Sequence, residues 1–146
     1  MSFSNDMRIG EEYEHKLMDY LLRRGFKVMQ THGVNKEFDV CTYDNNTIFH
    51  TYEVKFDRLH EKTGNLAIEY WDRGKWSGIK ATKAEYWVHC TEKMMYILTL
   101  SEFKEWLNLN RKYLNIKNGG DNNEAKMILI KPTNIVNNAW CETVEI

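Results

Sequence analysis

Three charged residues on either side of a predicted turn have the types and spacing of a metal-dependent hydrolytic site. Asp39 precedes the turn at Asp44-Asn45-Asn46, and Glu53 and Lys55 follow it, two residues apart. Alternate side chains of a β-strand lie on one face, roughly 6–7 Å apart, so Glu53 and Lys55 point the same way. A charged pair on an otherwise apolar strand is costly unless it has partners. We therefore predict that Asp39 and Glu53 hold a divalent metal ion and a water molecule.

A fourth candidate, Glu14, lies on a helix predicted over residues 8 to 24. It shares a side of that helix with Leu17 and Leu21, so it should face the body of the protein. If it converges with Asp39 and Glu53, the three carboxylates repel one another and take up protons unless a cation neutralises them. Oxygen ligands with retained waters favour Mg²⁺, and Mn²⁺ can substitute.

In such a site each partner has an expected chemical role. The metal would lower the pKa of a bound water molecule and polarise a phosphoryl oxygen. Lys55, one step along the same strand face, would orient that water or stabilise the charge that builds up on the phosphate. The predicted reaction is therefore hydrolysis of a phosphate ester. The same E-x-K pattern is also common as a surface ion pair, in which Glu53 and Lys55 would both be exposed and Glu14 would be distant.

The strands around the turn must meet in one particular register for this site to form. Residues 37–44 and 47–57 are rich in β-branched and aromatic types on either side of the turn, which predicts a hairpin. A two-residue Asn45-Asn46 turn with regular pairing would place Asp39 opposite Tyr52 and turn Glu53 to the other face. Shared faces require a three-residue loop or a β-bulge. We predict that Asp39 and Glu53 share a face.

The rest of the chain predicts an α/β (α+β) fold with a mixed central sheet flanked by helices. Further strands are expected at 26–30, 66–71, 86–91, 94–99 and 126–130, with a loop over 72–79 and a helical turn near 82–84. A second long helix is expected after Ser101 as its N-cap. The order is roughly αβββ-β-(α)-ββ-α-β, in a single domain spanning residues 1–146.

Composition narrows the class of protein. A net charge of −1 lacks the strong positive balance that announces a nucleic-acid binder, and the basic cluster at 73–83 is also compatible with a solvated loop. The three cysteines form no CxxC pair, which argues against a disulfide framework and a zinc site. No apolar run suits a signal peptide or a membrane span. We expect a soluble cytoplasmic protein with no membrane partner.

The run from Gly10 to Lys55 resembles the core of the PD-(D/E)XK nuclease superfamily, whose fold is restriction-endonuclease-like, and in particular its small archaeal and phage-type Holliday junction resolvases. The matching features are the helix glutamate at Glu14, the first-strand entry at Gly25-Phe26, the motif aspartate at Asp39, and the E-x-K at Glu53 and Lys55. Phe38 stands where the superfamily has proline, and Asn35 is the nearest counterpart of a loop serine of archaeal resolvases.

This resemblance implies roles for the matched residues. Asp39, Glu53 and the backbone carbonyl of Val54 would bind Mg²⁺ or Mn²⁺. Glu14 would act on the metal directly or through water, and Lys55 would be the catalytic lysine.

The residues after the E-x-K strand resemble a phage-encoded branch of the same superfamily, in segments 63–69 and 74–79 and in the later Gly-Gly-Asp turn. Such residues would lie at the mouth of the site, where glycines permit close approach of a sugar-phosphate backbone. Trp71 and Trp76 suit base stacking, although rim packing is the commoner role of such a pair. The candidate DNA-binding residues are Asn35, Lys36, Arg73, Lys75, Ser77, Lys80 and Lys83.

The function expected first is a Mg²⁺-dependent DNA endonuclease, specifically a phage-type resolvase that cuts Holliday junctions or other branched DNA during recombination. Two cuts need two active sites, so this expectation includes a homodimer. The alternative is a phage endonuclease or nickase that acts on ordinary duplex or single-stranded DNA. An alternative of another class is a non-catalytic nucleic-acid-binding protein that retains the nuclease fold.

Overall fold

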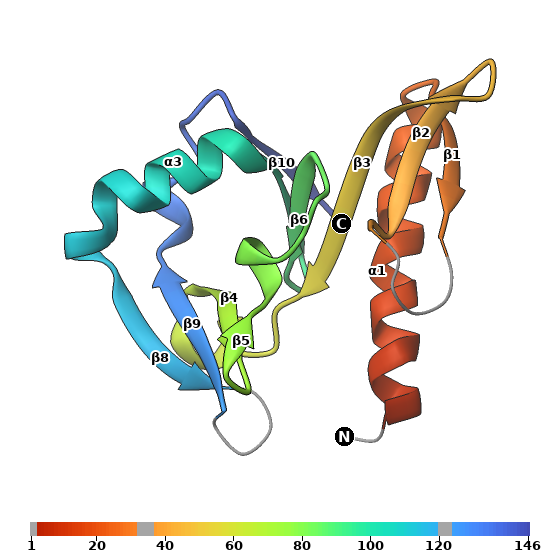
Figure 1. Cartoon of the computed structure of the whole chain (residues 1–146). Coiled ribbons are helices and arrows are strands. Elements are labelled where there is room, and N and C mark those ends of the chain that lie inside the picture. The colour runs from red at the N-terminus through yellow and green to blue at the C-terminus, as the bar shows by residue number, and fades with distance from the viewer. Residues whose placement is uncertain (1–2, 32–36, 120–123) are drawn as a thin grey trace.

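A computed structural model describes residues 3–31, 37–119 and 124–146. One long helix, α1 (Phe3–Arg23), covers one face of a large β-sheet, while α3 (Leu100–Asn110) and a second, smaller sheet lie on the other side (Figure 1). No helix in these described ranges is long and apolar enough to cross a membrane. The arrangement confirms the predicted mixed sheet with flanking helices.

The large sheet has six strands and carries the predicted site. Its order is β1-β2-β3-β6-β7-β10, in which β3 and β6 run parallel and every other neighbouring pair is antiparallel. The longest strand, β3, lies near the centre, between β2 and β6 (Figure 1). The strands are β1 (Lys27–Gln30), β2 (Val40–Asp44), β3 (Thr47–Phe56), β6 (Tyr86–Cys90), β7 (Met94–Thr99) and β10 (Cys141–Glu145).

The smaller sheet has four antiparallel strands in the order β5-β4-β9-β8. They are β5 (Lys75–Trp76), β4 (Leu66–Asp72), β9 (Ala125–Ile130) and β8 (Asn115–Gly119). The short helices are α2 (His60–Thr63) and the 3₁₀ turns η1 (Gly78–Lys80), η2 (Arg111–Tyr113) and η4 (Pro132–Asn134).

Two hydrophobic cores lie on opposite faces of the six-stranded sheet, because successive strand residues point to opposite sides. On the α1 side, Leu17 and Leu21 pack with Val54 and Val88. On the other side, Trp87 of β6 packs with residues of α3 and the smaller sheet, including Phe103, Leu66 and Ile130. The fold therefore fixes both faces of β3 and β6, the strands that position the candidate site.

The β2–β3 hairpin has the register that the predicted site requires. Asn45 and Asn46 have positive φ angles of 47° and 65° and form a two-residue turn, which suits a tight hairpin. A β-bulge then intervenes, because Tyr43 pairs with Ile48 whereas Thr42 pairs with His50. The extra residue shifts Val40 opposite Tyr52 and so brings Asp39 and Glu53 to the same face. The prediction of shared faces is confirmed.

Three local predictions were wrong. The expected loop over 72–79 contains a tight turn at Arg73-Gly74 and the short strand β5, because both turn residues adopt positive φ angles and reverse the chain. The helical turn expected near 82–84 lies earlier, in η1. Helix α3 begins at Leu100 with Thr99 as its N-cap, so it follows β7 directly and does not start after Ser101.

Gly78 allows η1 to lie against β4. Its φ is +50°, and a Cβ atom there would lie 2.2 Å from the backbone oxygen of Glu69. Gly74 offers a matched control, because its φ is +80° but nothing lies within 4 Å of the position of its Cβ. We expect Gly74→Ala to cost about 1–2 kcal/mol from the left-handed backbone alone. Gly78→Ala should cost at least about 2 kcal/mol more, because backbone atoms must move. Urea unfolding tests this, and equal losses in the two variants would contradict it.

Candidate active site

Glu53 and Lys55 lie on one face near the carboxyl end of β3, as their spacing predicts. The Glu53 side chain is only 17% exposed, whereas that of Lys55 is 50% exposed. The Lys55 Nζ atom lies 3.9 Å from Glu53 Oε2, and the Thr82 hydroxyl donates a hydrogen bond of 3.2 Å to Glu53 Oε1. A carboxylate buried to this degree is not half of an exposed surface ion pair. The backbone of β3 that carries Glu53 pairs in parallel with β6, with Glu53 opposite Trp87.

Asp39 is buried beside Glu53 and is held by the backbone of β3. Its Oδ2 atom accepts a hydrogen bond of 2.8 Å from the Val54 N–H, and its own N–H donates to the Tyr52 carbonyl. The carboxyl groups of Asp39 and Glu53 lie within hydrogen-bonding range of each other. The β2–β3 hairpin therefore places the two acids side by side.

This proximity changes the proton affinity of Glu53. Burial, which is the largest cause, raises the pKa of Glu53 from its ordinary value of 4.5 to about 7; the Asp39 carboxylate adds to the rise, while Lys55 and Thr82 oppose it. Below about pH 7, uptake of a proton by Glu53 relieves both the cost of burying its charge and the repulsion from Asp39. A divalent cation would relieve the same repulsion more completely.

The donor set of the pair suits Mg²⁺. It consists of two adjacent carboxylates, which are hard oxygen ligands, and Mg²⁺ is commonly held by one or two carboxylates while keeping several waters. In the described ranges, no group of three or more histidine, cysteine, aspartate or glutamate side chains is arranged to hold a metal. Asp39 and Glu53 would therefore be the side-chain ligands, with water and backbone oxygen completing the shell.

Glu53 opens into a cavity of about 420 Å³. Its lining includes Lys55 and Lys83, together with Gly78 and Thr82 in and after η1. A larger hollow of about 620 Å³ lies on the other side of Lys55, with Asp57 and His89 among its lining. Lys55 lines both hollows. A phosphate that reached Lys55 would thus lie beside the acidic pair.

The structure places Glu14 on the buried side of α1. Its Oε1 atom accepts a hydrogen bond of 3.1 Å from Gln30, at the end of β1, and Gln30 in turn contacts the exposed His15. Glu14 does face the body of the protein, as predicted. No group of three or more potential metal ligands is found in the described part of the chain, so a direct contact of Glu14 with a metal stays a prediction. A role for Glu14 through water stays a prediction.

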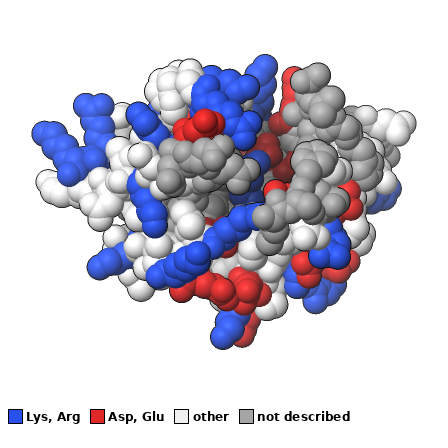
Figure 2. All heavy atoms as spheres, turned by 90° about the horizontal axis from the view of Figure 1, so that it is seen from below, with Lys and Arg blue, Asp and Glu red and all other residues white. Residues whose placement is uncertain are grey.

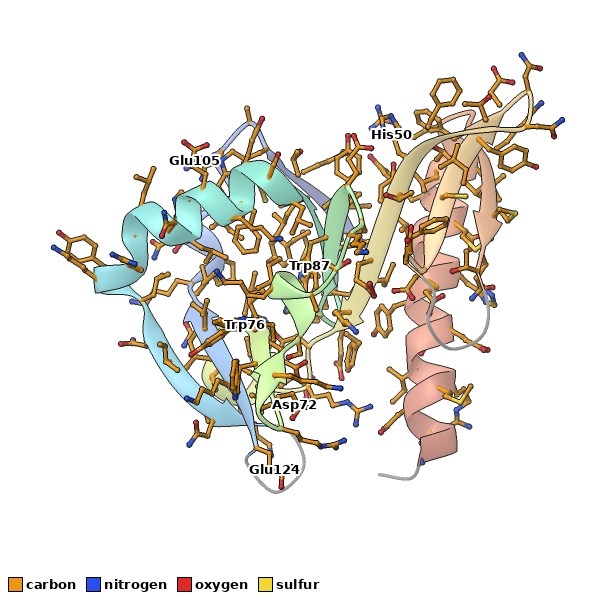
Figure 3. All side chains as sticks on the ribbon, in the orientation of Figure 1. His50, Asp72, Trp76, Trp87, Glu105 and Glu124 are labelled. Atoms are coloured by element: carbon orange, nitrogen blue, oxygen red, sulfur yellow. The ribbon has the colours of Figure 1, made fainter. Side chains whose placement is uncertain are left out.

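The predicted DNA-binding residues lie in different surroundings. Lys83 lines the site cavity, and Lys75 lies exposed on β5. Arg73 is in the β4–β5 turn with ion pairs to Asp72 and Glu124, at the end of the smaller sheet that Figure 3 marks with those two acids. The Ser77 hydroxyl is buried without a hydrogen-bond partner in the described structure. Asn35 and Lys36 lie outside the described residues.

A buried polar network next to Lys55 was not predicted from the sequence. His89 Nε2 lies 2.7 Å from Asp57 Oδ2, and both side chains are almost fully buried. The Trp87 indole donates to His89 Nδ1. An indole N–H is only a donor, so Nδ1 must accept and the ring proton is on Nε2, facing Asp57. The sequence did carry one signal: Asp57 follows Lys55 by two residues, so strand alternation places it on the same face as Glu53 and Lys55.

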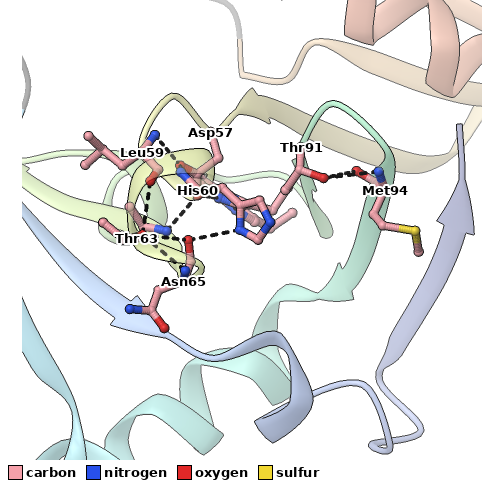
Figure 4. A network of polar contacts seen from close by, with 10 residues as sticks. Asp57, Leu59, His60, Thr63, Asn65, Thr91 and Met94 are labelled. Atoms are coloured by element: carbon pink, nitrogen blue, oxygen red, sulfur yellow. Dashed lines mark hydrogen bonds and ion pairs between the residues drawn. The ribbon is translucent and has the colours of Figure 1, made fainter.

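Asp57 also holds the chain that leaves β3. Its carboxylate accepts backbone hydrogen bonds from Leu59 and His60 at the start of α2 and from Ala67 in β4 (Figure 4). Burial alone would raise its pKa, but the hydrogen bond from His89 and those from the amides of Ala67 and Leu59 outweigh burial, so the pKa of Asp57 is lowered. The network therefore joins the end of β3 to β6 and to the smaller sheet, and it lines the same hollow as Lys55.

The raised pKa of Glu53 predicts how stability depends on pH without metal. The folded state retains a proton that the unfolded chain loses above pH 4.5, so stability falls as the pH rises from about 4.5 through about 7. The loss attributable to Glu53 is at most roughly 3 kcal/mol, at about 1.4 kcal/mol per pKa unit. Urea unfolding in EDTA at several pH values should show this decline in the wild type and a smaller one in Glu53→Gln. Parallel curves for the two proteins would contradict the assignment.

Comparisons with known proteins show the fold. No protein-family model matches the sequence, and a search of curated proteins finds no match. Among solved structures, the chain is similar to a bacterial homing endonuclease, with a TM-score of 0.56 and 16% sequence identity over 94% of this chain and 84% of the other. The described strands and helices therefore form a nuclease-like fold.

Proposed function

We propose that this protein is a Mg²⁺-dependent DNA endonuclease. The observation that carries the proposal is the buried Asp39–Glu53 pair, in which Glu53 lines a cavity together with Lys55, its neighbour on the same strand face. Burying two adjacent acids next to an open cavity costs stability unless they bind something. The fold adds support, because the similar solved structure is that of a homing endonuclease, a protein that cuts DNA.

The geometry suggests a different role for each side chain: the two acids would bind the metal, and the two lysines would contact phosphate. Asp39 is immobilised by the Val54 amide and Glu53 by the Thr82 hydroxyl, so the two carboxylates present fixed oxygen atoms to a cation. A bound metal would supply an activated water molecule and neutralise charge on the phosphate. Lys55 is half exposed and can donate from Nζ to a phosphate oxygen or to the attacking water. Lys83, on the cavity wall, would hold a neighbouring phosphate.

Within this class, we propose branched DNA as the first substrate, by the resemblance of Gly10 to Lys55 to junction resolvases, with a homodimer supplying the two active sites. Duplex or single-stranded DNA is the alternative. The test incubates the protein with a four-way junction, a linear duplex of the same sequence and a single strand, each with Mg²⁺. Faster cleavage of the junction supports a resolvase, and cleavage of the other DNAs at an equal or higher rate supports the alternative. Binding without cleavage of any DNA would overturn the proposal and favour a non-catalytic DNA-binding protein.

A further inference from the structure

A separate groove of about 300 Å³ lies between α3 and the smaller sheet. Its apolar floor includes Ile79, Leu107 and Ile128. Trp76 lies beside it, on the side of the smaller sheet that faces α3 (Figure 3). We call this hollow the α3 groove. None of the residues matched to the nuclease motif lines it.

The charged residues that line the α3 groove are all cations: Lys80, Lys104 and Arg111. In the described ranges, none of the three forms an ion pair with a carboxylate, whereas Arg24, Arg58 and Arg73 elsewhere are paired with acids. Figure 2, which views the molecule from below, shows lysine and arginine side chains among uncharged residues at its left, and acids toward the centre and right. This concentration of unneutralised cations favours an anionic partner.

An exposed aromatic surface accompanies these cations. Trp76 is 59% exposed, and Lys80 Nζ lies 5.7 Å from the centre of its ring. Trp71 meets Trp76 in an edge-to-face arrangement at 4.9 Å, which fixes the orientation of the indole. Grooves that bind single-stranded nucleic acid combine cations along the backbone with an aromatic platform for the bases. The α3 groove has both features.

The α3 groove also adjoins the candidate active site. Gly78, at the start of η1, lines the cavity of Glu53, and Ile79 and Lys80, the next two residues, line the α3 groove. A nucleic-acid strand that passes Lys55 therefore needs to cross only η1 to enter the groove.

We infer that the α3 groove binds an unpaired segment of the DNA substrate, with a base stacked on Trp76 and the flanking phosphates on Lys80, Lys104 and Arg111. The choice of DNA as the nucleic acid rests on the proposed function. The binding of a single strand rests on the groove itself. An apolar floor and an exposed indole suit a base that is not buried in a duplex, whereas fully paired DNA offers mainly its phosphates. Branched DNA that carries a single-stranded flap or gap would supply such a segment.

The test measures binding of a short fluorescein-labelled oligodeoxythymidine by fluorescence anisotropy in EDTA, where no cleavage occurs. Trp76→Ala should weaken binding by roughly tenfold through lost stacking. The double variant Lys104→Gln with Arg111→Gln should weaken binding and reduce the slope of log affinity against log salt by about 1.4, for two lost phosphate contacts on a single strand. The matched control Lys93→Gln with Lys131→Gln removes the same charge at exposed positions outside the groove and should leave the slope nearly unchanged.

Wild-type affinity in Trp76→Ala and in the groove double variant would overturn the inference. So would equal loss in the groove and control double variants, which would indicate only a general effect of charge. If the groove variants instead altered self-association in analytical ultracentrifugation and left oligonucleotide binding intact, the occupant would be a second copy of the chain. Because the assay contains no metal, its outcome does not depend on whether the protein cleaves DNA.

Discussion

Replacing Glu53 with glutamine is expected to reduce Mg²⁺-dependent DNA cleavage by at least about 100-fold, the loss typical of removing one group that stabilises developing charge. Glutamine keeps the shape of the side chain and can still accept a hydrogen bond from Thr82, so the fold should persist. It removes the charge that, with Asp39, would bind the proposed cation. Asp39→Asn should have the same effect, because it leaves only one charged ligand at the pair.

The measurement is the single-turnover rate of cleavage at saturating DNA, together with DNA affinity in EDTA. Affinity should change little, since neither carboxylate attracts phosphate. Asp44→Asn is the matched control: Asp44 lies on the same hairpin but is exposed and pairs with Lys27 at 3.9 Å. It should retain full activity. Wild-type rates in Glu53→Gln would mean that the buried pair has no part in catalysis.

Asp57→Asn is expected to destabilise the protein by about 3 kcal/mol, because it removes the charge from the acceptor of several buried hydrogen bonds. The Asp57 carboxylate accepts hydrogen bonds from three backbone amides and faces His89, and an asparagine side chain offers only one accepting oxygen to them. Urea unfolding at neutral pH measures the loss. Asp6→Asn, which breaks a half-exposed ion pair with Arg58, should cost less than about 1 kcal/mol.

The stabilisation from Asp57 has a defined pH dependence. Its pKa in the folded state is lower than its ordinary value of 3.8, so the contribution is fully present above that value. It is lost as the pH falls through the lower folded pKa. The difference between wild type and Asp57→Asn should therefore narrow in strong acid. A constant difference down to the lowest pH at which the protein folds would show that the charge of Asp57 does not stabilise it.

The central hairpin could be predicted from the sequence because its signals are local. Strand parity placed Glu53 and Lys55 on one face, and the asparagine turn set the ends of the hairpin. Together, these two constraints mean that Asp39 can share a face with Glu53 and Lys55 only if the strand pairing is irregular. The β-bulge at Thr42–Tyr43 is that irregularity. The amphipathic pattern of the first helix likewise placed Glu14 on its buried side.

The remaining features depend on contacts between segments distant in sequence. His89 offered no signal by itself, because its partners Asp57 and Trp87 are identified only once β3 and β6 are known to run side by side. Thr82 reaches Glu53 only because η1 packs against β4. The small sheet joins β4 to β8 and β9, which follow it by some forty residues or more along the chain. No local pattern specifies such a pairing.

The metal requirement of the wild-type protein tests the proposed active site most directly. Cleavage of a four-way junction and of its linear duplex control is followed in Mg²⁺, in excess EDTA, and after Mg²⁺ is restored. If Asp39 and Glu53 hold a catalytic cation, cleavage occurs with Mg²⁺, stops in EDTA and returns when Mg²⁺ is restored. Cleavage that continues unchanged in excess EDTA, or no cleavage under any of these conditions, would contradict a Mg²⁺-dependent nuclease site at this pair.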